Sequence, residues 1–300
     1  MFVRVVHGGT AAGECFQTGR SGSASRTDGL GYATGRRTRK RPPVNLRRVL
    51  PVVAATAYLT PLREGGSLPA LMEADDLGTY VVKFTGAGQG PKALVAEIVV
   101  GELGRALGIA VPDLALIEVA AEIGRREPDE EVQALVTASA GLNLAVDFLP
   151  GAVGYDRSFV VPAEAAARVL WLDAYVANVD RSARNTNLLI WHKTLWAIDH
   201  GACLRFHHSW GDVDTFAGGS YNYGDHVLNQ LGNPRRVHED LSSQVTAALL
   251  EEILLQVPEA WLLPDPTRPD PRAPQDTATA REAYREYLLA LLQAAERWLP

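Results

Sequence analysis

Two short apolar runs in the middle of the chain form its clearest pattern. Residues 187–190 and 194–198 are rich in Leu, Ile and other apolar side chains, and the polar pair His192–Lys193 stands between them. Short β-prone runs joined by a tight polar turn are typical of a β-hairpin. We therefore predict two antiparallel strands that fold back at His192 and Lys193.

Side chains suited to a metal ion stand at the open end of this predicted hairpin. Asn185 precedes the first strand and Asp199 ends the second, one residue out of direct opposition and within reach of one ion. Their oxygens are hard ligands, suited to Mg²⁺ with phosphate in the remaining positions. Asp180 lies five residues before Asn185, and kinase-like enzymes build a catalytic base and metal site from D-x-x-x-x-N, a hairpin and Asp-x-Gly. The alternative is an ordinary hairpin whose open end is capped by Asp and Asn.

The rest of the chain divides into a β-rich front and a helical back. Strand-like runs are predicted at 50–59, 79–85, 114–120 and 132–138, and helices at 92–107, 162–177, 238–257 and 277–298. Residues 139–161 are Gly-rich, and we interpret them as an irregular connection. This order predicts an α+β, bilobal fold with a small β-rich N-lobe (44–147) and a mainly helical C-lobe (148–300).

The first 43 residues differ from all that follow. They are rich in Gly, Ser, Thr and Arg, lack periodicity and end in the basic stretch 36–43. We predict a disordered basic tail or an upstream extension of the reading frame, with a nucleic-acid or membrane arm as the alternative.

Charge and cysteine content narrow the classes of function. Residues 1–48 hold ten Lys and Arg against two Asp and Glu, whereas the remainder holds 19 basic and 33 acidic residues. An acidic body argues against direct nucleic-acid binding by the folded part. The two cysteines form no disulfide framework and point to a reducing cytoplasm. The longest apolar run (49–59) is too short for a membrane span.

A lysine within an apolar strand is the next informative position. The chain has only four lysines against 25 arginines, and Lys83 lies within the run Tyr80–Phe84. Kinase-type enzymes use such a lysine to hold the α- and β-phosphates, paired with a helix glutamate. Glu97, among small and apolar neighbours, is the expected partner, because Glu102 can pair with Arg105 at the surface. The alternative is a lysine that extends from an edge strand into water.

Three further groups of residues are candidates for phosphate binding, for support of the site or for metal binding. Gly65, Gly66 and Ser67 could bring backbone N–H groups to a phosphate. For these three residues alone a plain β-turn is the favoured interpretation, and the phosphate role gains weight only from their position before the Lys83 strand. Asp173 is expected to brace the Asp180 segment or to lie on a solvated helix face. Four histidines are candidate zinc ligands, but their spacing matches no compact zinc-binding motif: His200, His207, His208 and His226.

Together these segments resemble the HipA-like kinase family. The resemblance covers about residues 50–260 and lies in GGSLPALMEADDLGTYVVKF (65–84), the helix with Glu97, NVDRSARNTNLLI (178–190) and LWAIDHG (195–201). More distantly, the Asp-Arg-x-x-x-Asn loop resembles that of phosphoinositide kinases. The Asp-Arg-x-x-x-Asn and Asp-His-Gly motifs carry the most specific part of the resemblance.

The resemblance implies a bilobal protein-kinase-like fold, ATP with Mg²⁺, and phosphoryl transfer to a hydroxyl of a protein Ser/Thr or a small molecule. By position, Asp180 would be the catalytic base, Asn185 and Asp199 the metal ligands, and Lys83 the phosphate-binding partner of Glu97. The chain is shorter than the family's bacterial toxin, and residues 1–43 do not look like that protein's N-terminal subdomain. A toxin role and an antitoxin-like partner are therefore not implied.

Two other classes of function stay open at this point. A non-catalytic nucleotide-binding or partner-binding module would usually have lost one of the five polar positions, and this chain keeps them all. A metal-dependent phosphohydrolase would use Asp180, Asp199 and His200. The residues that hold adenine are expected within 136–150.

Overall fold

The computed structural model describes residues 49–62, 67–88, 90–125, 127–211, 213, 219–264 and 270–300. The predictions for residues 1–43, for Gly65 and for Gly66 therefore lie outside the described residues. Within the described ranges, no helix is both long and apolar enough to cross a membrane.

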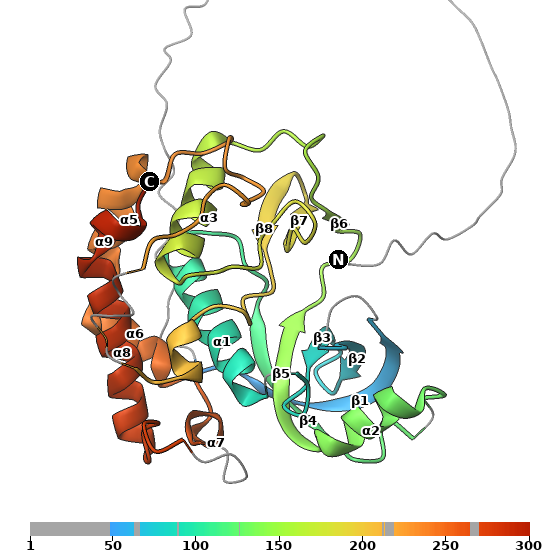
Figure 1. The fold of residues 1–300 in the computed structure, drawn as a ribbon. Helices are drawn as coiled ribbons and strands as arrows, with labels where there is room; N and C mark the ends of the chain where they lie inside the picture. Colours follow the sequence, from blue (N-terminus) through green and yellow to red (C-terminus); the bar gives the residue numbers. More distant parts are fainter. Residues whose placement is uncertain are drawn as a thin grey trace, which may run out of the picture. The chain divides into compact units, whose positions relative to one another are not determined.

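The front of the chain forms a closed five-stranded barrel (Figure 1). Its strands are neighbours in the order β1-β2-β3-β5-β4, with parallel pairing of β1 and β4 closing the ring and antiparallel pairing elsewhere. The strands are β1 (Val52–Pro61), β2 (Ala70–Ala74), β3 (Thr79–Lys83), β4 (Leu114–Val119) and β5 (Gly141–Asp147).

Alternation along these strands fills the barrel with apolar side chains. Met72, Val82, Ile117 and Ala145 come from four different strands and are fully buried in one cluster. Each neighbour in sequence points to the opposite face, so Val81 and Lys83 lie on the side of β3 that faces away from this cluster. Lys83 is thereby directed toward the first helix.

The helix α1 (Pro91–Ala106) lies between the barrel and the other helices in Figure 1. Pro91 begins the helix, where its missing N–H costs nothing. Every residue from 94 to 104 is buried, which is typical of a helix covered on all sides. The helix ends close to the predicted residue 107, and Gly108 follows it with a φ of 75°, the left-handed conformation that glycine readily adopts after a helix.

The predicted hairpin is confirmed as the strands β7 (Leu188–Trp191) and β8 (Thr194–Ala197). Leu188 pairs with Ala197 and Trp191 with Thr194, which is the register expected from a turn at residues 192 and 193. Both turn residues have positive φ, as a two-residue hairpin loop of this kind requires. The short strand β6 (Val153–Gly154) adds to the β7 edge.

The helices that follow β6 lie on the side of α1 that faces away from the barrel (Figure 1). Tyr175 and Trp171 of α3 meet Trp298 near the end of the chain, with ring centroids 5.8 and 5.6 Å from it. The helical elements are α3 (Ala163–Tyr175), η1 (Arg205–His208), η2 (Pro234–Arg236), α5 (His238–Gln244), α6 (Ala247–Leu254), α7 (Glu259–Leu262), α8 (Thr277–Gln293) and α9 (Ala295–Trp298).

Two predictions about the front half are wrong. Residues 132–138, expected as a strand, belong to the helix α2 (Glu130–Ala138). The Asp129 carboxylate accepts from the N–H groups of Glu131 and Val132 and so starts a helix that strand propensity alone does not indicate. Residues 139–161, expected as irregular, contain β5, the strand that pairs with both β3 and β4.

Candidate functional site

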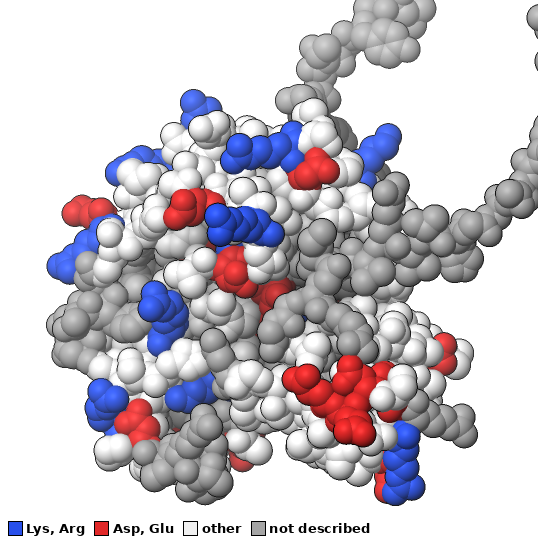
Figure 2. Space-filling model, turned by 45° about the vertical axis from the view of Figure 1, so that its right-hand side comes forward, with Lys and Arg blue, Asp and Glu red and all other residues white. Residues whose placement is uncertain are grey.

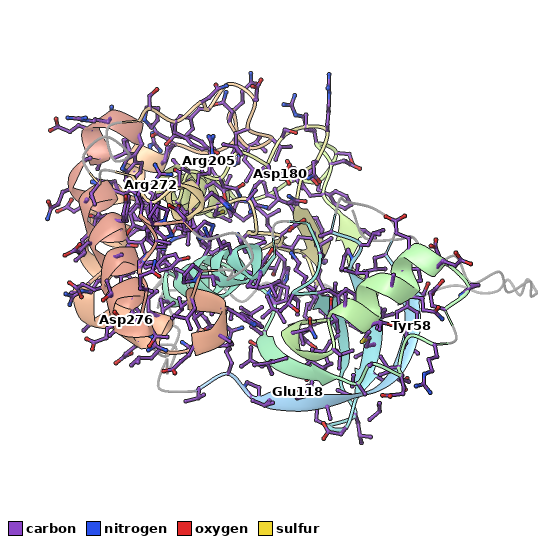
Figure 3. All side chains as sticks on the ribbon, turned by 60° about the horizontal axis from the view of Figure 1, so that its bottom comes forward. Tyr58, Glu118, Asp180, Arg205, Arg272 and Asp276 are labelled. Carbon is purple, nitrogen blue, oxygen red and sulfur yellow. The ribbon has the colours of Figure 1, made fainter. Side chains whose placement is uncertain are left out.

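A cleft of about 640 Å³ lies against the barrel, α1 and the segments that flank the β7–β8 hairpin. Every predicted site residue that the structure describes lines this main cleft: Ser67, Lys83, Glu97, Asp180, Asn185 and Asp199. In Figure 3, the labelled Asp180 lies between the helices on the left and the barrel at the lower right. Sequence segments up to 132 residues apart thus meet in one cavity.

Lys83 joins the two halves of the main cleft through two carboxylates. Its Nζ donates to Glu97 Oε1 and, at 2.7 Å, to Asp199 Oδ1. The expected Lys83–Glu97 ion pair is therefore present. Glu102, the competing carboxylate, pairs with Arg105 at 3.5 Å; it is buried, whereas the sequence suggested a surface pair.

The charges in this trio shift one another's pKa values. Burial would lower the pKa of Lys83, but Asp199 and Glu97 outweigh burial and hold it above its ordinary value. Lys83 in turn holds the pKa of Asp199 well below its ordinary range. Burial raises the pKa of Glu97, and Lys83 only partly opposes that rise, because one ammonium group serves two carboxylates. Lys83 and Asp199 are therefore charged at neutral pH.

Asparagines surround Asp180 on the loop of residues 180–187, called the Asp180 loop. The Asn185 amide donates to both carboxylate oxygens of Asp180 at 3.0 Å, and the Asn187 amide donates to the Asp180 carbonyl at 3.0 Å and to Oδ2 at 3.3 Å. The N–H of Asp180 donates to Asn178 Oδ1 at 3.0 Å. Its carboxylate is therefore fixed in direction while it still lines the cleft.

The buried ion pair of Arg181 with Asp173 holds the Asp180 loop in place. Arg181 Nε donates to Asp173 Oδ2 at 2.5 Å, and His226 Nε2 lies 2.9 Å from the same oxygen. The Arg181 guanidinium also donates to the carbonyl oxygens of Asn187 and Ile198, which flank the open end of the hairpin. Asp173 thus braces the loop, as predicted, and a solvated helix face is excluded by its full burial.

The segment after β8 turns sharply at the site. Asp199 has a φ of 58°, a left-handed conformation that Asp tolerates better than most residues. A side chain at Gly201 would place its Cβ 3.2 Å from Glu97 Oε1, so glycine keeps this approach open. His200 is buried, and burial together with Arg181 lowers its pKa to about 3. Neutral His200 lines a smaller cavity behind Lys83 and not the main cleft.

The structure does not gather the histidines into a zinc site. His226 contacts Asp173, and His207 contacts Tyr284 and His208. Among the residues that the structure describes, no group of three or more His, Cys, Asp or Glu side chains could hold a metal ion. Asn185 and Asp199, the pair predicted from the sequence, both line the main cleft.

Sequence reasoning missed the supporting contacts of Asn187 and Arg181. Asn187 stands two residues after Asn185, and nothing in its spacing distinguishes it from a residue that simply precedes a strand. Its positive φ of 45° and its bonds to Asp180 exist only in the folded chain. Arg181 could have been suspected, because an arginine next to a catalytic candidate needs a partner when it is buried.

Charged side chains of both signs are mixed on the described surface. On the face drawn in Figure 2, the largest group of acidic side chains lies at the lower right, and other acidic side chains lie dispersed among Lys and Arg over the rest. Among the described residues of this face, the basic side chains form no continuous stripe of the kind that nucleic-acid-binding proteins carry.

A family model agrees with the sequence resemblance, because residues 57–286 match the model of the HipA-like kinases. Among solved structures, the proinflammatory kinase CtkA of Helicobacter pylori aligns over 81% of this chain and 94% of its own, at 13% identity and a TM-score of 0.40. The Golgi casein kinase aligns over 84% of this chain and 75% of its own, at 12% identity and a TM-score of 0.38. No curated protein matches the sequence significantly. Because the family model covers more than two thirds of its length, the chain belongs to the HipA-like kinase family.

Proposed function

We propose that this chain is an ATP- and Mg²⁺-dependent kinase that transfers the γ-phosphoryl group to a hydroxyl of a protein Ser/Thr or of a small molecule. One observation carries the proposal: Lys83, Glu97, Asp180, Asn185 and Asp199 converge on one cleft. These side chains are the ones that phosphoryl transfer needs for phosphate binding, proton removal and metal binding.

The proposal includes a bilobal protein-kinase-like arrangement. Residues 44–147, with the barrel, would form the nucleotide-binding N-lobe, and residues 148–300 would form the C-lobe with the Asp180 loop. In support, Lys83 and Glu97 come from the first range, Asp180 and Asp199 from the second, and the main cleft has walls from both.

The side chains of the cleft fit ATP and a hard divalent cation. A cavity of about 640 Å³ falls within the range of small-molecule sites. Asn185 uses its amide nitrogen on Asp180 and Asp199 uses Oδ1 on Lys83, so each keeps an oxygen for a cation. Two protein oxygens with phosphate and water in the other positions are the usual ligands of Mg²⁺ at phosphate sites. Bound Mg²⁺ would neutralise charge on the phosphates.

The other groups have separate tasks in this mechanism. Lys83, held charged by its two carboxylates, would bind the α- and β-phosphates, and Gly65–Ser67 would offer backbone N–H groups to them. Asp180 would accept the proton of the acceptor hydroxyl as its oxygen bonds to the γ-phosphorus. The bond from that phosphorus to the β-phosphate oxygen breaks, and its electron pair leaves with ADP. Catalysis then comes mainly from positioning and charge neutralisation.

An assay with γ-labelled ATP and Mg²⁺ tests the proposal directly. Asp180→Asn should lower phosphoryl transfer and ATP turnover by about 10²- to 10⁴-fold, the usual contribution of a positioned base. ATP should still raise the melting temperature of the variant, because the phosphate-binding groups remain. Asp240→Asn, a carboxylate change on α5, is the matched control.

The same measurements separate the alternatives. Stabilisation by ATP without any transfer by the natural sequence would favour a non-catalytic nucleotide-binding module. Phosphoesterase activity without ATP, together with a tightly held transition metal, would favour a phosphohydrolase. Activity of Asp180→Asn equal to that of the natural sequence would defeat the assigned base.

A further inference from the structure

A second cavity adjoins the Asp180 loop on the side of β6. It has a volume of about 460 Å³, and residues 154–157 and 183–189 provide most of its wall. It shares three lining residues with the main cleft, which are Arg184, Asn185 and Asn187. A molecule held in this cavity would therefore lie next to the loop that carries Asp180.

The charged lining of this second cavity is mainly basic. Arg157 and Arg184 are both exposed, and neither guanidinium forms an ion pair or hydrogen bond within the described part of the chain. The lining also contains the Asp156 carboxylate, which accepts from Ser158 N–H at 2.7 Å and from Ser158 Oγ at 2.5 Å. The carboxylate is thus engaged by its own turn, and two guanidinium groups keep free donors. We call this cavity the arginine pocket.

A buried hydroxyl in the same wall also lacks a partner. Tyr155 is only 3% exposed, and its hydroxyl makes no hydrogen bond within the described residues. A buried polar group without a partner costs about 1–3 kcal/mol, so such groups are rare unless a ligand or water serves them. Burial raises the pKa of Tyr155 although Arg157 opposes the rise, so the phenol keeps its proton at neutral pH. An anion beside Arg157 would supply the acceptor that this hydroxyl lacks.

We propose that the arginine pocket binds an anionic group, a carboxylate or a phosphate, of the phosphoryl acceptor. The inference rests on the proposed kinase activity and names the chemical class of its substrate. Guanidinium groups bind both kinds of anion through two parallel hydrogen bonds. An anion held there places a neighbouring hydroxyl of the same molecule at the Asp180 loop. The preferred substrate is therefore a hydroxyl compound or a Ser/Thr segment that carries negative charge.

The test compares acceptors with and without an anionic group. One arm uses Ser peptides flanked by Glu, by Gln or by Lys, and the other uses glycerol phosphate against glycerol, each with the full chain, labelled ATP and Mg²⁺. We expect kcat/KM for the anionic member of one series to exceed the neutral member by about ten- to 100-fold, as a charge-assisted hydrogen bond implies. The series that responds shows whether a side-chain carboxylate or a phosphate is the natural group.

Arg157→Gln is the informative variant, because Arg157 lines the arginine pocket alone, whereas Arg184 also lines the main cleft. The variant should lose most of the preference for the anionic acceptor through a higher KM. Arg125→Gln, a surface change beside α2, is the matched control and should keep the preference. Equal use of neutral and anionic acceptors would overturn the inference. So would a variant that raises the KM for ATP and keeps the acceptor preference, since the pocket would then serve the nucleotide.

A separate readout distinguishes failure of the pocket from failure of the kinase assignment. If the natural sequence transfers phosphate to none of these acceptors, binding of the Glu-flanked peptide and of glycerol phosphate is measured by calorimetry without ATP. Binding that Arg157→Gln weakens by about tenfold or more would support the pocket while the kinase proposal fails. No binding of either anion, or equal binding by Arg157→Gln, would refute the arginine pocket itself.

Discussion

Replacement of Lys83 by methionine tests the electrostatic centre of the site. The change removes the cation that lies between Glu97 and Asp199 and keeps an unbranched side chain of similar length. Glu97, whose side chain is 4% exposed, then loses its cationic partner and keeps a hydrogen bond from the backbone of His200. Lys83→Met should therefore destabilise the fold as well as abolish phosphoryl transfer.

The size of the effect follows from burial and distance. Two unit charges about 4 Å apart interact by about 4 kcal/mol at the effective dielectric constant of partly buried sites. Removing one partner of a buried pair typically costs about 3–5 kcal/mol, since the other charge stays buried. Asp199 contributes less, because its side chain is 46% exposed to solvent. We expect a loss of about 3 kcal/mol in the free energy of unfolding at pH 8.

The loss should depend on pH in a definite direction. Burial already raises the pKa of Glu97 above its ordinary value of 4.5, and the variant lacks the ammonium group that opposes this rise. A carboxyl group with a raised pKa in the folded state is most stabilising below its unfolded pKa, and the stability is lost as pH rises through the folded pKa. The gap between Lys83→Met and the natural sequence should therefore be smaller at pH 5 than at pH 8.

Urea unfolding at the two pH values, followed by tryptophan fluorescence, measures this gap. Lys193→Met, at the exposed hairpin turn, is the control for loss of a lysine, and Glu97→Gln in the Lys83→Met background should recover part of the stability. A loss in Lys83→Met that is equal at both pH values, or absent at pH 8, would contradict the assigned pair.

Two further predictions concern the support of the site. Asp173→Asn should lower the free energy of unfolding by about 3–5 kcal/mol at pH 7, because Arg181 loses its buried partner. Burial by itself would raise the pKa of Asp173, but Arg181 and His226 outweigh burial and hold this pKa below its ordinary value of 3.8. The stability that ionised Asp173 contributes is present above pH 3.8 and is lost as pH falls through its folded-state pKa. The difference in free energy of unfolding between the variant and the natural sequence should therefore shrink below about pH 4, as measured by urea titrations. Gly232→Ala should destabilise by about 2 kcal/mol or more in thermal melts, because its Cβ would lie 2.7 Å from backbone carbon atoms of Ala166 and Ala167. Gly211→Ala, whose Cβ meets nothing within 4 Å, should stay within about 0.5 kcal/mol, and equal effects of the two changes would refute the packing argument.

The sequence predicted best where local rules decide the structure. The hairpin depends on two apolar runs and a turn of two residues, which act over about ten residues of chain. The end of α1 depends on one glycine. The same reasoning failed at residues 132–138, because the four-residue spacing of Val132 and Val136 fits one face of a strand as well as one face of a helix, and valine itself favours a strand. The carboxylate cap at Asp129 and burial of both valines on one side of α2 decided the outcome.

By itself, then, the sequence determined the local elements, such as the hairpin and α1, and indicated which side chains are candidates for phosphoryl transfer. The tertiary structure alone decided how they meet. Lys83 and Asp199 are 116 residues apart, and their contact needs the closed barrel, α1 and the β7–β8 hairpin together. The two arginines of the arginine pocket, Arg157 and Arg184, likewise come from separate segments with no motif in common. Long-range contacts of this kind depend on packing across the whole chain, and no local pattern of residues encodes them.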